Sequence, residues 1–174
     1  MKKGFIAAAI ATVCVLSSAS VLASDGTINF TGEVLDSACT VDIGANNKME
    51  VKMGKVAKTA FTGVGSTASA TEFNLKLTKC PAAVTSVAVK FDGTAYSGDN
   101  SVLALTADDG VATGVGVQIS DASQTVVSLF TPSSSVTLAE GDNTIPFTAR
   151  YIQKAAAITS GPANSVAQFT LNYN

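Results

Sequence analysis

The sequence predicts an all-β protein of the sandwich or barrel type. Short runs in which apolar and polar residues alternate recur along the chain, and a period of two is typical of strands with one buried face. No stretch after residue 23 keeps apolar residues at helical spacing for three turns. Segments rich in Gly, Asp, Asn and Ser separate the alternating runs, and turns are expected there. Many short strands with such breaks favour a β-sandwich or barrel.

The length and composition limit what the protein can do. The chain has 174 residues, which suggests one domain or at most two. Eleven basic residues stand against thirteen acidic ones, so the charge gives no electrostatic reason to bind nucleic acid. There is no His, which excludes Ser–His and Cys–His catalytic pairs and any His-ligated zinc or haem site.

The first 23 residues have the pattern of a secretory signal peptide. Lysines follow Met1, an apolar run spans residues 5–16, and small residues come next. We place the cleavage site between Ala23 and Ser24. A transmembrane helix is the alternative, but the apolar run is short for a bilayer and no other long apolar run follows. A lipoprotein signal at Cys14 is disfavoured by the bulky residue before it.

Two cysteines, Cys39 and Cys80, remain after the expected cleavage, and the charge of the mature chain is nine basic against thirteen acidic residues. Export makes an oxidising compartment the expected setting, and two cysteines allow a single pairing. Closing a loop of this length contributes about 4 kcal/mol in the chain-entropy model. Two reduced, buried thiols are the alternative.

Six alternating runs are expected to form strands, and they follow one another along the whole mature chain. They span residues 26–34, 73–78, 87–91, 115–119, 145–152 and 167–173. Pro146 falls inside one of these runs and cannot donate to a sheet. We therefore expect it at an edge, at a bulge or in a strand that changes sheets.

Both ends of the mature chain have strand patterns, which is unusual because most domains fray at their termini. Here a good strand pattern begins within a few residues of the cleavage site, and another runs to the last residues. Both can be ordinary strands of a complete sandwich. Alternatively, one is a donor strand for another molecule and the other borders a groove that lacks a strand.

Several motifs in a fixed order carry a resemblance to a known family. In one-letter code they are GTINFTGEV (26–34), FNLKLTKC (73–80), VLAL (102–105), VGVQISD (115–121), NTIPFTARY (143–151), with Gly161 fourteen residues from the end and a penultimate Tyr173. The chain resembles the subunits of chaperone–usher pili over its whole mature length, and most closely the major subunits of type 1 fimbriae.

The resemblance implies an immunoglobulin-like sandwich that lacks its last strand. In that family the N-terminal extension of the next subunit fills the resulting groove, a form of β-augmentation. The domains implied are a signal peptide (1–23), a donor-strand extension (24–36) and a pilin sandwich (37–174).

The resemblance also implies which residues form the joint between subunits. The groove-facing donor residues would be Ile28, Phe30, Gly32 and Val34. The strand that borders the groove and meets the chaperone would carry Ala167, Phe169, Leu171 and Tyr173, preceded by Gly161. A Cys39–Cys80 bridge would pin the first strand to a later one.

The partners implied are identical or related pilin subunits, a periplasmic chaperone and an outer-membrane usher. The protein would pass through the periplasm and reside in a fimbrium on the cell surface. No enzyme activity, metal, nucleic acid or small-molecule cofactor is expected.

Two other classes of function compete with a polymerising subunit. A stand-alone secreted binding module would be a monomer indifferent to the loss of residues 24–34. A secreted hydrolase would need paired carboxylates or a Ser–Lys pair. The acidic turn at residues 108–110 is more typical of a solvated turn than of a calcium or catalytic site. The Gly pair at 114 and 116 lacks the third Gly and the helix of a dinucleotide loop.

Overall fold

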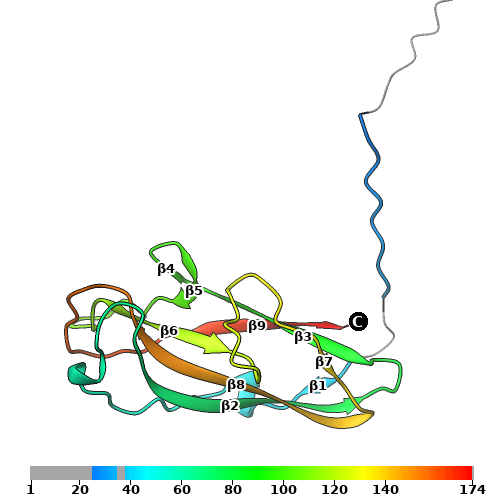
Figure 1. The fold of residues 1–174 in the computed structure, drawn as a ribbon. Coiled ribbons are helices and arrows are strands. Elements are labelled where there is room, and N and C mark those ends of the chain that lie inside the picture. Colours follow the sequence, from blue (N-terminus) through cyan, green and yellow to red (C-terminus); the bar gives the residue numbers. More distant parts are fainter. Residues whose placement is uncertain (1–24, 35–37, 174) are drawn as a thin grey trace, which may run out of the picture. The chain divides into compact units, whose positions relative to one another are not determined.

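The computed structural model describes residues 25–34 and 38–173, and the chain divides into two units, Met1–Val34 and Leu35–Asn174. The described part of the first unit, residues 25–34, contains neither helix nor strand. The second unit holds every strand of the described chain (Figure 1). The expected signal peptide and its cleavage site at Ala23 and Ser24 lie outside the described residues.

The second unit is built from two antiparallel sheets, which confirms the all-β prediction. The larger sheet has the order β1-β2-β8-β6-β5-β4, and the smaller has the order β7-β3-β9. The strands are β1 (Thr40–Val41), β2 (Thr67–Cys80), β3 (Ser86–Gly93), β4 (Ala95–Tyr96), β5 (Asp99–Leu103), β6 (Val115–Ser120), β7 (Val136–Thr137), β8 (Gly141–Gln153) and β9 (Ala167–Tyr173). Two short 3₁₀ turns, Ala45–Asn47 and Lys58–Ala60, are the helical elements of the described residues.

Two long strands, β2 and β8, form the spine of the larger sheet. They pair from Thr67 opposite Ile152 to Cys80 opposite Gly141, with register shifts near both ends. Strand β6 pairs with β8 only from Thr148 onward, so Pro146 lies where β8 has β2 as its one partner. Of the three positions expected for Pro146, the structure thus shows the edge, since one side of β8 has no partner strand at this residue.

Aromatic side chains join the two sheets at the centre of the core. Phe147 of β8 stacks on Phe73 of β2 with ring centroids 5.7 Å apart. Phe91, on β3 of the other sheet, meets Phe147 edge-on at 5.1 Å. Offset and edge-to-face pairs are the favoured aromatic geometries, and these three rings bury a large apolar area. The fully buried neighbours are Leu75, Leu77, Val87, Val89, Val102 and Ile145.

The long strands were predictable and the short ones were not. The runs at 73–78, 87–91, 115–119, 145–152 and 167–173 all fall within β2, β3, β6, β8 and β9. The run at 26–34 forms no strand in this chain. Strands β1, β4 and β7 are two residues long, too short to carry a period.

An ion pair joins the start of β5 to the end of β8. The Lys154 Nζ donates to Asp99 Oδ2 at 2.7 Å, and Ser101 donates its backbone N–H and its hydroxyl to Asp99 Oδ1 at 2.9 and 2.7 Å. These hydrogen bonds, that of Lys154 first, lower the pKa of Asp99 to about 2. The ionised carboxylate is thus the form that the fold stabilises.

We predict that Asp99→Asn flattens the acid side of the stability profile. A folded-state pKa of about 2 lies below the unfolded value, so the ionised Asp99 stabilises the fold above about pH 4. This stabilisation is lost as the pH falls through about 2. Urea unfolding between pH 2 and 7 measures it, with Asp92→Asn as the control. An unchanged pH slope in Asp99→Asn would contradict the assignment.

Candidate functional site

Strand β9 is an edge strand with one free side. It pairs with β3 from Val87 opposite Tyr173 to Gly93 opposite Ala167, and it has no second strand partner among the described residues. Alternate amides and carbonyls on its other side therefore lack ladder partners. A long edge of this kind is a template for another strand.

The side chains of β9 alternate as the sequence predicts. Phe169, Leu171 and Tyr173 are half-buried and pack against the core, whereas Gln168 and Thr170 are exposed. Ala167, expected on the same face as Phe169, is exposed at the start of the strand. The three larger apolar residues are thus covered from the core side and left partly open on the other.

A second extended stretch, residues 48–58, also lacks a strand partner; we call it the wall segment. Residues 49–56 make no backbone–backbone hydrogen bond among the described residues. Met49, Val51 and Met53 are half-buried and alternate with exposed polar residues. Of these, Met49 and Met53 pack against the core, as does Val56. The Met53 carbonyl oxygen accepts a hydrogen bond from the Ser69 hydroxyl. The segment therefore presents strand-like alternation together with backbone groups that have no backbone partner.

The wall segment and β9 pack against the same core, and contacts at two points relate the chain from Cys39 through the wall segment to β9. Ahead of the wall segment, the Tyr173 side chain is hydrogen-bonded with the backbone of Cys39, just before β1. Burial raises the pKa of Tyr173, and this hydrogen bond opposes the rise. At the other end, residues 54–58 and 158–164 line one cavity. The two stretches therefore run in opposite directions, as the cyan and red parts of Figure 1 show.

The cavity at the start of β9 has a volume of about 590 Å³ and a mostly apolar lining. Val56, Phe61 and Ile158 contribute side chains to it, together with Lys55 and Lys58. The hydroxyl of Tyr151, which also lines it, donates to the carbonyl oxygen of Ala163 at 3.0 Å. An apolar side chain of an added strand would find room here.

Gly161 has a steric role in forming this cavity. A Cβ built on it would collide with the carbonyl oxygen of Gly110 and would lie 2.7 Å from the backbone nitrogen of Ala112. The same close approach lets the Ala112 N–H donate to the Pro162 carbonyl oxygen at 2.9 Å. Only Gly allows the 158–164 stretch to pack this tightly before β9 begins.

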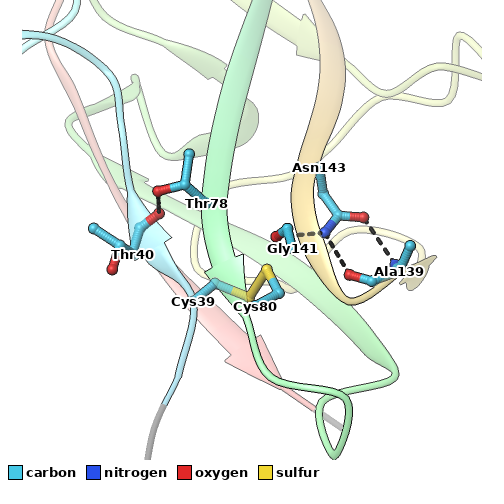
Figure 2. Close-up of a disulfide and its surroundings, with 7 residues drawn as sticks. All are labelled: Cys39, Thr40, Thr78, Cys80, Ala139, Gly141 and Asn143. Atoms are coloured by element: carbon cyan, nitrogen blue, oxygen red, sulfur yellow. Dashed lines mark hydrogen bonds between the residues drawn. A yellow bond between two sulfur atoms is a disulfide. The ribbon is translucent and has the colours of Figure 1, made fainter.

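The disulfide anchors the chain just before β1, nine residues ahead of the wall segment. Cys39 and Cys80 are bonded, joining the residue before β1 to the end of β2 across a separation of 41 residues (Figure 2). The Thr78 hydroxyl donates to the Thr40 carbonyl oxygen at 3.4 Å beside it. Since Cys39 also meets Tyr173, the bridge holds the beginning of β1 close to the end of β9.

The expected donor residues lie in the first unit. Ile28, Phe30 and Val34 are 79%, 92% and 97% exposed, which is unusual for large apolar side chains. A Cβ on Gly32 would meet nothing within 4 Å. The segment therefore has an apolar face without a covering partner in the described chain.

Most of the predicted acceptor residues lie along one side of the core, and the structure shows that the wall segment, which was not predicted, lies there too. Gly161, Phe169, Leu171 and Tyr173 lie together with the Cys39–Cys80 bridge along the open side of the core. The wall segment was not predicted. Its alternating sequence KMEVKM, residues 48–53, carries the signal, but the run is short and rich in charge.

Among the described residues, no three Cys, Asp or Glu side chains form a group that could hold a metal ion. No helix in the described part of the chain is long and apolar enough to cross a membrane.

The chain is similar to known proteins over almost its whole length. The family model described as Fimbrial protein matches residues 28–174. A type-1 fimbrial protein A chain of Escherichia coli strain K12 is 42% identical over 183 residues, covering 99% of this chain and 100% of that protein.

Solved structures of fimbrial proteins are also similar to this chain. An antigen and type I fimbria protein of Burkholderia pseudomallei is 42% identical, with a TM-score of 0.61, covering 85% of this chain and 97% of that one. A chain in the structure of a chaperone–usher pilus has a TM-score of 0.66 at 23% identity, covering 87% and 96%, and it supports the fold alone.

We predict that Gly161→Ala destabilises the sandwich by about 1–3 kcal/mol, because the added methyl group overpacks the contact with residues 110–112. Gly32→Ala is the matched control, since its methyl group meets nothing within 4 Å. Urea unfolding of both variants as monomers measures the difference. Equal stabilities would mean that the close approach at Gly161 is not required.

Proposed function

Because this chain belongs to the fimbrial protein family and is a structural subunit of a chaperone–usher pilus, we propose that it polymerises by donor-strand exchange. Its sandwich is immunoglobulin-like and lacks its last strand. In the proposed joint, residues 24–36 of one copy fill the open side of the next copy, between β9 and the wall segment. Contacts of this kind do not close on themselves, so they extend a filament.

One observation supports the proposal most strongly. The sandwich lacks a strand beside β9, and the same chain has an unpaired N-terminal segment with the pattern of a strand. The free side of β9 needs hydrogen-bond partners, and so does the backbone of residues 49–56, where only the Met53 carbonyl oxygen has one among the described residues, the Ser69 hydroxyl. The half-buried side chains beside them need cover. Residues 28–34 supply an extended backbone and an exposed apolar face. One strand added between them satisfies both needs at once.

The energetics support a very stable joint. Full burial of Ile28, Phe30 and Val34 contributes about 1.5–3 kcal/mol each, and the paired backbone adds to this. Gly32 stands where the donor passes the shallow part of the groove, so a side chain there would clash. The disulfide and the contacts of Gly161 hold the acceptor in shape before the strand arrives.

The proposal extends to the route of assembly. Residues 1–23 direct export and are removed between Ala23 and Ser24. In the periplasm a pilus chaperone lends a strand to the β9 edge, and an outer-membrane usher replaces that strand with the next subunit. The finished fibre supports cell adhesion.

A peptide test separates this function from a stand-alone secreted module. We predict that a chain lacking residues 24–34 melts at low temperature and gains a large, dose-dependent rise in Tm with a peptide spanning residues 24–36. A ligand that binds only the folded state stabilises it by RT ln(1 + [L]/Kd), about 2.7 kcal/mol at a hundredfold excess over Kd.

Two variant peptides make the test specific. Phe30→Asp in the peptide removes the largest apolar contact and should abolish the rise, whereas Asn29→Ala on the opposite face should keep it. A truncated chain that is stable alone and indifferent to all three peptides would have a complete sandwich. That result would favour the secreted module.

A further inference from the structure

The exposed face of the wall segment carries a row of lysines. Lys48, Lys52, Lys55 and Lys58 are all exposed, with Glu50 as the one acidic residue among them. The ion pairs of the described residues are Lys90–Asp92 and Lys154–Asp99, so these four lysines have no acidic partner within the described chain. The wall therefore has an unneutralised net charge of +3.

The opposite charge lies on the proposed donor. Residues 24–36 contain Asp25, Glu33 and Asp36 and no Lys or Arg, a net charge of −3 from side chains. On the other flank of the open side, the residues of β9 between its apolar positions are Gln168, Thr170 and Asn172, none of them charged. Any charge recognition at this site thus comes from the wall segment.

The geometry of the acceptor determines which charges meet. We take β9 as the strand that sets the direction of the donor, because its free side continues a sheet in which β3 and β9 are antiparallel. A donor antiparallel to β9 is parallel to the wall segment, and it brings its C-terminal residues to the start of β9. Val34 then faces the cavity. Glu33 points to the opposite, outer face because successive strand residues alternate. Lys55 and Lys58, which line that cavity, stand at this end of the wall.

The apolar pattern alone leaves the register of the donor open. A slip of two residues keeps the same side chains inward, so apolar alternation does not distinguish one register from the next. A slip of two residues away from the cavity, however, moves Glu33 from Lys55 and Lys58 toward Lys52, and a longer slip brings it to Glu50. The register at the cavity is thus the one that places Glu33 beside two lysines, and the like charge of Glu50 opposes longer slips.

We infer that the lysine row recognises the acidic N-terminal segment of a second copy, and that pairing of Glu33 with Lys55 and Lys58 of that copy sets the register. The inference rests on the proposed donor-strand function. The pairs lie on the outer face, so they act mainly on the rate and selectivity of joining and weaken with salt.

Charge reversal in the full chain tests the inference. We expect Glu33→Lys alone, and Lys55→Glu with Lys58→Glu, each to slow fibre assembly by about tenfold at low ionic strength. Combining the three substitutions restores the rate to within about threefold of the unchanged chain. At 0.5 M salt the differences shrink. The matched controls are Glu72→Lys and Lys76→Glu, exposed residues of β2 that assemble at the unchanged rate.

The outcomes separate this inference from the function on which it rests. Phe30→Asp in the full chain blocks assembly if the donor strand is correct, whatever the charges do. If Phe30→Asp assembles normally, the donor-strand function fails. If Phe30→Asp blocks assembly but the reversals have no effect, or the combined variant is not restored, only the register inference fails. Lys55→Gln with Lys58→Gln replaces the double reversal if the latter does not fold, and an unchanged rate there contradicts the inference equally.

Discussion

The unpaired backbone on the free side of β9 governs how the whole sandwich is arranged. A sandwich can leave an edge exposed to water, but here the edge stands over half-buried core side chains such as Phe169 and Leu171. The wall segment faces the same problem, since residues 49–56 have no backbone partner in the described chain. One more strand would supply hydrogen-bond partners to the backbone groups and would cover the half-buried apolar side chains.

The remaining features of the fold hold this acceptor ready. The aromatic contacts of Phe73, Phe91 and Phe147 fix the two sheets face to face. The disulfide joins the start of β1 to the end of β2, and the hydrogen bond between Tyr173 and the Cys39 backbone links the same point to the end of β9. The contact at Gly161 shapes the cavity at the opposite end. An acceptor whose walls are already positioned loses little further entropy when a strand enters, and preorganisation of this kind strengthens binding.

The sequence predicted what repeats over several residues and missed what depends on neighbours in space. The alternation of Ile145, Phe147 and Tyr151 was sufficient to place β8, and the cysteine count left only one pairing for Cys39. The two-residue strands have no period to detect. The wall segment was missed because a lone alternating stretch with four lysines is equally typical of a surface loop. The clash that requires Gly161 involves residues fifty positions away, which no local pattern reveals.

Amide hydrogen exchange in the assembled fibre would reveal whether a strand has been added beside β9. We expect strong protection of residues 28–34, of residues 49–56 and of the alternate β9 amides that face away from β3. The same β9 and wall amides should exchange quickly in a monomer that lacks residues 24–34, while β2 and β8 stay protected in both. Equal exchange of the outward β9 amides in fibre and monomer would rule out donor-strand exchange, because no strand would then have been added at that edge.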